Sequence, residues 1–376
     1  MSREPAYRIL VLGGYGNFGA RIVDALASQA RCHLLIAGRD AVRAGQAAAR
    51  LRGAAAVVEG MGLDAHDPQF AQFLRQQRID LVIHTAGPFQ GQSYEVARAC
   101  IEAGAHYVDL ADGRAFVTGI TALDAAARER NVLVVSGAST VPALSAAVLD
   151  RYRSRFDSIA TVSIGITPGN RTPRGLSTVE SVLSYCGKPF ERWQRGRWQR
   201  VYGWQDQHRV FYPRLGWRWF ANCDVPDLSL FPLRYGVTDS VKFHAGLELR
   251  TIQWSLWLMS WLARWRIVSN WRPAARFLRA ASELLLRFGS DAGGMHVVVT
   301  GTTAGRQRRI EWLLTALAGH GPQIPCIAAI VIARKLASGR WTQHGAMPCL
   351  DLMTLDEFDD AVKGMEIGWQ EKMIDA

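Results

Sequence analysis

Short apolar runs rich in β-branched residues alternate with alanine-rich stretches over residues 7–139. The runs that predict strands are 8–14, 33–38, 54–60, 80–87, 106–111 and 131–139, and the stretches between them, such as 121–130, predict helices. Strands that are apolar on both faces and separated by helices are typical of a doubly wound parallel sheet. We therefore predict an α/β domain over residues 1–150.

The pattern changes after residue 150 and predicts a second domain, of α+β type, over residues 151–376. Alternation of apolar and small or polar residues predicts a strand at 156–167, of the kind found in antiparallel sheets. Residues 185–235 are rich in Trp, Arg, Gly and Pro and look rich in loops, whereas 250–288 predict long helices that are broken near Asn270 and Pro273. The remaining predicted elements are strands at 295–303 and 308–316, joined by a turn at 304–306, and a helix at 324–339 that Gly339 closes. The sheet of this domain is expected to be mixed or antiparallel.

A glycine-rich turn follows the first predicted strand and opens a helix. Gly14, Tyr15, Gly16, Asn17, Phe18 and Gly19 fit the pattern G-x-G-x-x-G of Rossmann-like domains. In that pattern the first glycine makes a tight turn, the second lets the backbone approach a pyrophosphate, and the third lets helix and strand pack closely. The free N–H groups and positive dipole of the helix N-terminus then favour phosphate. These residues predict a dinucleotide site.

The end of the second strand indicates which dinucleotide is bound. NAD sites usually place an acidic residue there, to accept hydrogen bonds from the ribose hydroxyls. Here the strand ends in small residues followed by Arg39, whose guanidinium can pair with a 2′-phosphate. We therefore predict NADP(H). Asp40 comes one position later and could instead cap the next helix, and Asp64 is placed either to reach the adenine edge or to serve as a turn residue.

Three further loops are expected at the carboxyl edge of the sheet, where open α/β sheets bind ligands. The loop after the fourth strand contains Ala86, Gly87, Pro88 and Phe89. Gly87-Pro88 predicts a turn beside the nicotinamide ribose, and Phe89 either packs on the nicotinamide ring or belongs to the core. The loops after the fifth and sixth strands are 110–113 and 136–139.

These motifs together carry a family resemblance. GGYGNFG, followed by GPFQGQSYEVARACIEAGAHYVDLADG and GASTVPALS, resembles the saccharopine dehydrogenase-like (saccharopine reductase) family over residues 7–150. The resemblance continues more loosely over 319–358. It implies an NADP-binding Rossmann domain followed by an α+β domain that covers the nicotinamide. It also implies cofactor contacts by Gly14, Gly16, Gly19, Arg39, Gly87, Pro88 and Phe89.

The candidate catalytic residues are Asp112 and Tyr94. Hydride transfer is the chemistry of the cofactor, so the protein has to position the acceptor and often to supply a proton. Asp112 follows the fifth strand and either meets the substrate or caps the helix near Arg114. Tyr94 either donates a proton or packs in its helix, and His84, inside a strand, is a weaker candidate. We expect no metal site, because no cluster of metal-ligand residues appears.

Composition narrows the function class. The net charge is +11, but basic clusters are short and no basic-aromatic motif indicates nucleic-acid binding. The six cysteines are scattered, as is typical of reduced, mostly buried thiols in a cytoplasmic protein. We expect a small-molecule substrate, and a homodimer as the default assembly.

Four tryptophans lie on one face of the helix predicted within 250–270. Trp254, Trp257, Trp261 and Trp265 follow the spacing i, i+3, i+7 and i+11. Three interpretations remain open for this face: burial in the second domain or a dimer interface, peripheral contact with a membrane or lipid, or a lid over an apolar substrate.

The sequence as a whole predicts a cytoplasmic NADP(H)-dependent oxidoreductase, with a C=N, C=O or C=C acceptor that the sequence does not identify. Two alternatives stay open. One is a trans-acting enoyl reductase of a lipid pathway, which the tryptophan helix favours. The other is a non-catalytic NADP-binding regulatory protein that associates peripherally with a membrane.

Overall fold

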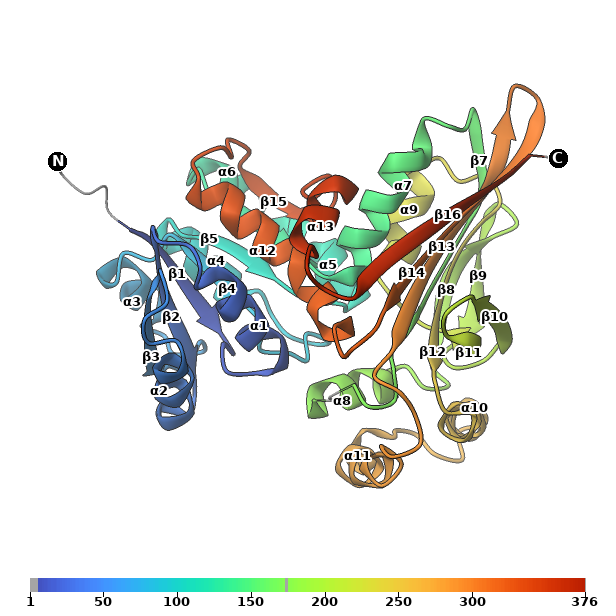
Figure 1. Cartoon of the computed structure of the whole chain (residues 1–376), viewed down its shortest axis with the longest axis horizontal. Helices are drawn as coiled ribbons and strands as arrows, with labels where there is room; N and C mark the ends of the chain where they lie inside the picture. Colours follow the sequence, from blue (N-terminus) through green and yellow to red (C-terminus); the bar gives the residue numbers. More distant parts are fainter. Residues whose placement is uncertain (1–5, 173–174, 376) are drawn as a thin grey trace. The chain divides into compact units, whose positions relative to one another are not determined.

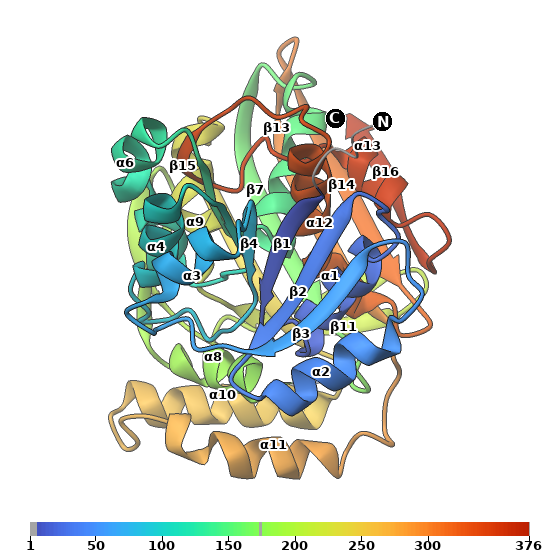
Figure 2. The same ribbon diagram turned by 90° about the vertical axis from the view of Figure 1, so that its left-hand side faces the viewer.

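The computed structural model describes residues 6–172 and 175–375. The chain forms two compact units, each of which draws on two segments of the sequence. Unit 1 is Met1–Leu144 with Gln323–Ala361, and unit 2 is Ser145–Pro322 with Val362–Ala376. In both views the two units have their own sheet and their own helices (Figure 1, Figure 2).

Unit 1 is built on a seven-stranded parallel sheet with the order β15-β6-β5-β4-β1-β2-β3. Figure 2 shows β4, β1, β2 and β3 side by side. Its strands are β1 (Tyr7–Leu12), β2 (Cys32–Gly38), β3 (Val57–Gly62), β4 (Leu81–His84), β5 (His106–Asp109), β6 (Leu133–Ser136) and β15 (Gly345–Pro348). Six of these strands have the order 3-2-1-4-5-6, which is that of Rossmann folds. The predicted doubly wound parallel sheet is therefore confirmed.

Helices cover this sheet because its strands are apolar on both faces. They are α1 (Asn17–Leu26), α2 (Ala41–Arg50), α3 (Phe70–Gln76), α4 (Glu95–Ala103), α5 (Arg114–Gly119), α6 (Asp124–Glu129), α12 (Ile324–Ala337) and α13 (Leu355–Ala361), with short turns of helix at Ile120–Leu123 and Thr140–Leu144. Leu10, Leu35 and Val82 of the sheet pack in one buried cluster with side chains of α3 and α4. On α1 the buried residues are Gly19, Ile22, Val23 and Leu26.

The segment 323–361 belongs to unit 1, which differs from the division at residue 150 that the sequence predicts. α12 is buried nearly all round, and the thiol of Cys326 contacts the carbonyl of Phe18 at 3.5 Å. β15 then pairs in parallel with β6, from Gly345 opposite Leu133 to Pro348 opposite Ser136. An apolar helix and a parallel edge strand need a sheet to pack against. Here that sheet is formed by the N-terminal segment of unit 1, far earlier in the chain.

Unit 2 is built on a mixed sheet with the order β10-β11-β12-β7-β13-β14-β16. Its strands are β7 (Ser158–Thr167), β10 (His208–Tyr212), β11 (Gly216–Asn222), β12 (Ser240–Leu247), β13 (Gly293–Thr303), β14 (Arg306–Ala316) and β16 (Ile367–Asp375). β7 pairs in parallel with β12, and the other pairs are antiparallel. This confirms the mixed sheet of the predicted α+β domain, and β7, β13 and β14 agree with the predicted strands.

One face of this sheet forms the core of unit 2. Phe243, Ile164, Val297 and Trp312 lie in one row across β12, β7, β13 and β14, and all four are buried. α7 (Ser145–Arg153) contacts β13, and α9 (Asp227–Arg234) contacts β12 (Figure 1). The remaining helices of this unit are α8 (Leu176–Ser184), α10 (Arg250–Arg264) and α11 (Ala275–Glu283), with a turn of helix at Arg272–Ala274 and another at Gly321–Gln323 where the chain passes to unit 1.

Residues 185–235 contain four strands and a helix, so the prediction of a segment rich in loops is wrong. They form the hairpin of β8 (Pro189–Gln194) and β9 (Arg197–Tyr202), the strands β10 and β11, and α9. Trp193 and Trp198 face each other across the hairpin, with ring centroids 5.4 Å apart. Tryptophan and arginine alternate here along half-buried strands, and aromatic residues favour such surfaces. The predicted break near Asn270 and Pro273 does separate α10 from α11.

Candidate dinucleotide site

The glycine-rich loop connects β1 to α1 at the carboxyl edge of the parallel sheet. The left-handed residue of its tight turn is Gly13, with φ = +77°, which precedes the motif residue Gly14 that the sequence assigns to this role. A Cβ at Gly13 would lie 2.8 Å from Oγ1 of Thr85. The Gly16 N–H donates to the Gly13 carbonyl at 2.8 Å and closes the turn. Gly13 is thus a functional residue that the pattern G-x-G-x-x-G missed, although the glycine pair at 13–14 was visible in the sequence.

The third glycine brings α1 against the turn. A Cβ at Gly19 would lie 2.3 Å from the Gly13 carbonyl oxygen and 2.7 Å from Cα of Gly14, which are both backbone atoms. The helical hydrogen bonds begin with Ala20, whose N–H donates to the Gly16 carbonyl. The N–H groups of Asn17, Phe18 and Gly19 precede this bond and point out of the helix end. This backbone cradle fits the phosphates of a dinucleotide.

Tyr15 extends from the glycine-rich loop to the end of β2. Its hydroxyl accepts a hydrogen bond from the Asp40 N–H at 3.2 Å, and the guanidinium of Arg43 lies 4.7 Å from its ring centroid. The Asp40 side chain accepts from the Arg43 N–H at 3.0 Å and caps α2, so the capping alternative describes its position. Arg39 follows β2 directly and is exposed. The residues at this strand end are therefore a tyrosine and arginines, with the one carboxylate engaged as a helix cap.

A small hollow of about 90 Å³ lies beside Tyr15. It is lined by Tyr15, Ala20, Arg43, Gln46, Ala47 and Arg50. Its charged lining is cationic, and it lies between the N-terminal part of α1 and the exposed side of α2. Because guanidinium groups pair well with phosphate, this hollow has the chemistry of a phosphate subsite.

Asp64 lies in the turn that follows β3. Its carboxylate accepts from the His66 N–H at 3.0 Å, and the side chain is exposed. This bond is an Asx turn, so the turn alternative describes the local role of Asp64. The position after β3 leaves its second carboxylate oxygen available for hydrogen bonds from a ligand.

The loop after β4 is fixed to β1. Both the N–H and the hydroxyl of Thr85 donate to the Leu12 carbonyl, at 2.9 and 2.8 Å. Ala86 is exposed, and Gly87 and Pro88, joined by a cis peptide bond, are partly buried. Phe89, in contrast, is buried, with ring centroids 5.1 Å from His84 and 5.4 Å from Phe116. Phe89 thus belongs to the core, and Ala86, Gly87 and Pro88 are the members of this loop that face outwards.

The two candidate catalytic residues have different surroundings. The Tyr94 hydroxyl donates to the Phe116 carbonyl at 2.6 Å, its ring packs on Phe116, and burial raises its pKa. Asp112 is exposed after β5, and its carboxylate accepts from the Gln90 side chain at 3.0 Å. The N-cap residue of α5 is Gly113. Tyr94 therefore anchors the loop after β5, and Asp112 is the candidate that solvent and substrate can reach.

A buried carboxylate at the end of β5 organises these loops. Oδ1 of Asp109 accepts hydrogen bonds from the N–H groups of Ala111 and Gly137 and from the Ser136 hydroxyl, each at 2.9 Å. The Tyr107 hydroxyl lies 3.1 Å from Nδ1 of His84, which extends this polar chain to β4. Sequence analysis missed Asp109. The signal was an acidic residue inside an otherwise apolar strand, which needs buried donors.

The pKa values in this network follow from burial. Removal from water raises the pKa of Asp109 to about 6, although the backbone donors from Gly137 and Ala111 and the Ser136 hydroxyl oppose the shift. Burial also lowers the pKa of His84 to about 4, so its imidazole is neutral at pH 7. His84 is a satisfied core residue, as its position inside a strand suggests.

Unit 2 contains a cluster of buried histidines on the second face of its sheet. His244 and His296 occupy one row on either side of Gly165, where a Cβ would lie 2.2 Å from Cε1 of His296. The His208 ring centroid is 4.2 Å from that of His244, and the Tyr212 hydroxyl is 2.7 Å from Nδ1 of His296. Burial lowers the pKa of His296 to about 3 and that of His244 well below its ordinary value. All are neutral at pH 7.

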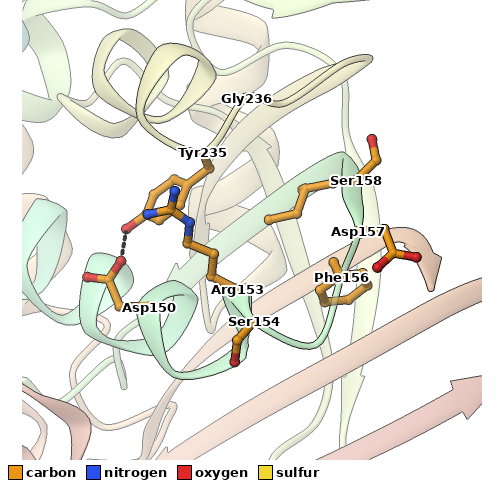
Figure 3. A pocket seen from close by; sticks show the side chains of 9 residues that line it. Asp150, Arg153, Ser154, Phe156, Asp157, Ser158, Tyr235 and Gly236 are labelled. Carbon is orange, nitrogen blue, oxygen red and sulfur yellow. Dashed lines mark hydrogen bonds between the residues drawn. The ribbon is translucent and has the colours of Figure 1, made fainter. Parts of the chain in front are cut away.

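A cavity of about 550 Å³ also lies in unit 2, between the end of α7 and the start of β7 (Figure 3). Figure 3 shows Arg153 extending toward the ring of Tyr235, whose hydroxyl donates to Asp150 at 3.0 Å. Burial raises the pKa of Tyr235, so the hydroxyl stays protonated. The lining is mixed in charge and lacks a paired nucleophile and base among the described residues, so the dinucleotide site carries the functional argument.

Residues 9–151 match the family model described as the saccharopine dehydrogenase NADP binding domain. The predicted resemblance is confirmed over this part of the chain, which contains the glycine-rich loop and the loops after β2, β3, β4, β5 and β6. This part of the chain is therefore similar to an NADP-binding domain of this type. No curated protein matches the sequence.

Solved structures match this chain at low sequence identity. GenD2 from gentamicin A biosynthesis, in complex with NAD, has 15% identity and a TM-score of 0.43, and the alignment covers 100% of this chain and 98% of that chain. An amine dehydrogenase from Mycobacterium smegmatis has 10% identity and a TM-score of 0.47, with 92% and 95% covered. An NAD binding oxidoreductase from Klebsiella pneumoniae has 14% identity and a TM-score of 0.40, with 83% and 76% covered. Similarities this low do not assign an activity.

Proposed function

We propose that this protein is an NADP(H)-dependent oxidoreductase that acts on a small molecule with a C=N, C=O or C=C acceptor. The observation that carries the proposal is the backbone cradle of Gly13, Gly16 and Gly19 at the start of α1. A side chain at Gly19 would occupy backbone positions, and one at Gly13 would meet Thr85. Such a loop, at the carboxyl edge of a doubly wound sheet, is suited to a pyrophosphate.

The preference for NADP(H) over NAD(H) rests on the end of β2. Arg39 is exposed directly after the strand, and Arg43 lies over the Tyr15 ring with Arg50 nearby in the same hollow. Asp40, the carboxylate nearest to this end, caps α2. A 2′-phosphate would gain charge-assisted hydrogen bonds from the guanidinium groups, whereas a ribose without it would gain none of them.

Bound NADP(H) would supply or accept the hydride, and the chain's own residues have to hold it and the acceptor. The N–H groups of Asn17, Phe18 and Gly19 hold the pyrophosphate. Thr85 fixes the loop after β4 to β1, so that Ala86, Gly87 and Pro88 keep their place beside the cofactor. We assign contact with the acceptor, and the proton at the reacting atom, to Asp112, because the Tyr94 hydroxyl is engaged by a backbone carbonyl.

Titration of the purified protein with NADPH and with NADH tests the cofactor assignment. We expect NADPH to bind about tenfold or more tightly, because one charge-assisted hydrogen bond stabilises by ~1.5–3 kcal/mol. Arg39→Ala should weaken NADPH binding by about tenfold and leave NADH binding unchanged. Arg98→Ala removes an exposed arginine of α4 and serves as the matched control. Equal affinity for the two nucleotides, or an Arg39 variant with unaltered preference, contradicts the assignment.

A substrate screen tests the activity. NADPH oxidation is followed with mixtures of amino acids and keto acids, with aldehydes and with enoyl thioesters, at saturating nucleotide. Turnover with any of these supports the proposal, and the active class decides between imine, carbonyl and enoyl reduction. Tight NADPH binding without turnover on every class indicates instead the non-catalytic regulatory protein that the sequence left as an alternative.

A further inference from the structure

Helix α10 of unit 2 buries two polar side chains and exposes large apolar ones. Gln253 and Ser260 are fully buried, whereas Trp254, Leu258 and Trp265 are 40%, 56% and 65% exposed. The buried polar groups are satisfied within the unit, since the Gln253 side chain accepts from the Leu247 N–H at 3.0 Å and the Ser260 hydroxyl donates to the Trp257 carbonyl at 2.6 Å. A helix that faces water normally exposes polar residues. The exposed face of α10 is therefore suited to an apolar partner.

The aromatic side chains of α10 form a ladder. Adjacent ring centroids of Trp254, Trp257, Trp261 and Trp265 lie 5.3, 6.2 and 5.2 Å apart. Trp254 also contacts Trp219 of β11, at 5.3 Å. The rings support one another, so the apolar side chains are held in place before any partner arrives.

The ladder continues across the β10–β11 hairpin. The guanidinium of Arg209 lies 5.4 Å from the Trp219 ring and 5.1 Å from the Trp217 ring, and Trp217 contacts Phe211 at 5.4 Å. Trp217 and Phe211 are each at least half exposed. We call the surface from Trp265 to Phe211 the tryptophan ridge. It spans a helix and a hairpin and is therefore a contiguous apolar patch, whereas apolar residues on a typical surface are scattered singly.

The segment that carries most of the tryptophan ridge is rich in arginine. Arg264 stacks over the Trp261 ring at 4.8 Å, and α11, which lies alongside α10 in both views, exposes Phe277 (Figure 1, Figure 2). Residues 250–288 contain seven arginines, Arg250, Arg264, Arg266, Arg272, Arg276, Arg279 and Arg287, and one acidic residue, Glu283. The partner of this surface should therefore be apolar and anionic.

We propose that the tryptophan ridge docks the protein on the surface of an anionic phospholipid bilayer. Tryptophan favours the boundary between headgroups and acyl chains, and arginine beside it pairs with anionic headgroups. No helix in the described part of the chain is long and apolar enough to cross a membrane, so α10 would lie in the plane of the interface. A second copy of the chain fits this surface less well, because a two-fold interface would bring the arginines of both copies together.

Co-sedimentation of the full chain with vesicles tests the proposal. One set contains phosphatidylcholine alone, and the other contains in addition about 30% phosphatidylserine, enough to set up the surface potential that attracts basic residues. We expect binding to the anionic vesicles that weakens as the salt concentration rises. Leu258→Ser with Trp265→Ser should lower this binding by about tenfold or more, because both side chains lose apolar contact. Arg272→Gln with Arg276→Gln should lower binding to the anionic vesicles alone.

Leu233→Ser is the matched control, since Leu233 of α9 is 91% exposed and lies outside the tryptophan ridge. Thermal unfolding followed by circular dichroism reports that each variant is folded, so failure of the proposed oxidoreductase function leaves this test unaffected. The proposal is overturned if neither vesicle binds, if both bind equally, or if the Leu258 and Trp265 variant binds as well as the wild type. Self-association that this variant abolishes, seen by sedimentation velocity without lipid, would assign the surface to a second copy and would also overturn it.

Discussion

The ring of Tyr15 covers Gly38: a Cβ at Gly38 would lie 2.5 Å from Cε1 of Tyr15 and 2.6 Å from its hydroxyl oxygen. A residue of the glycine-rich loop is thereby locked onto the last residue of β2. The hydroxyl also accepts from the Asp40 N–H, and Arg43 lies over the ring. Tyr15 thus connects the proposed pyrophosphate site with the proposed 2′-phosphate site.

Gly38→Ala should disrupt the connection that Tyr15 makes between these two sites. The new methyl group displaces the Tyr15 ring and with it the Arg43 guanidinium, so we expect NADPH affinity to fall by about tenfold, the equivalent of ~1.4 kcal/mol. Isothermal titration with NADPH measures the change. Gly45→Ala is the control, because a Cβ at Gly45 of α2 meets no atom within 4 Å. That variant should keep its affinity and gain up to ~1 kcal/mol of stability. Unchanged NADPH binding by Gly38→Ala would show that the position of Tyr15 is irrelevant to the cofactor.

Asp109 predicts a specific dependence of stability on pH. Its pKa in the folded chain, about 6, lies above the ordinary carboxyl value, so the folded state retains a proton that the unfolded state has released. The contribution of Asp109 to stability is therefore present below about pH 4 and is lost as the pH rises to about 6, by ~3 kcal/mol.

Comparison with Asp109→Asn isolates this contribution, because all other titrating groups are shared. Urea unfolding at pH 4 and at pH 7 gives the free energy of unfolding of both proteins. Relative to the wild type, the variant should become more stable as the pH rises from 4 to 7, by up to ~3 kcal/mol. Asp67→Asn, at an exposed position, is the control for the loss of a carboxyl group. A difference between Asp109→Asn and the wild type that does not change with pH would mean that burial does not perturb this carboxyl group.

Substitution of Asp112 should affect the kinetics, whereas substitution of Tyr94 should affect the stability. Asp112→Asn keeps the hydrogen bond with Gln90 within reach but removes the ionisable group, so we expect kcat to fall by about a hundredfold, with NADPH affinity unchanged. Tyr94→Phe deletes the hydrogen bond to the Phe116 carbonyl and should cost ~1 kcal/mol of stability. Steady-state kinetics with the substrate found by the screen, together with thermal unfolding, distinguish the two. A large loss of kcat in Tyr94→Phe with full activity in Asp112→Asn would reverse the assignment.

Local patterns in the sequence sufficed to predict the elements of residues 7–139 in unit 1. The buried strands and the amphipathic helices between them have periodicities that depend on near neighbours alone, and the glycine-rich loop is a contiguous motif. The glycine pair 13–14 was also visible in the sequence, although Gly13 was not assigned a role. Its left-handed φ became visible only with the backbone, because two adjacent glycines are equally able to adopt it.

Local patterns could not predict contacts between segments that are distant in the chain. The sequence predicted the helix at 324–339, but not that Cys326 of α12 meets Phe18 of α1, or that β15 extends the sheet beside β6. Likewise the strands between 189 and 222 alternate tryptophan and arginine on half-buried surfaces, where no clear apolar period exists. In both cases the partner that stabilises the segment lies far away in the chain.

The sequence by itself therefore determined the doubly wound sheet, the glycine-rich loop and the aromatic face of α10, because each is a property of residues close together in the chain. The tertiary structure alone decided which candidates face outwards. It buried Phe89, engaged the Tyr94 hydroxyl, collected three donors around Asp109, and left Trp254 and Leu258 of α10 exposed while Gln253 faces inwards. Burial and hydrogen bonding depend on every element packed around a side chain, and that packing is settled only when the whole chain has folded.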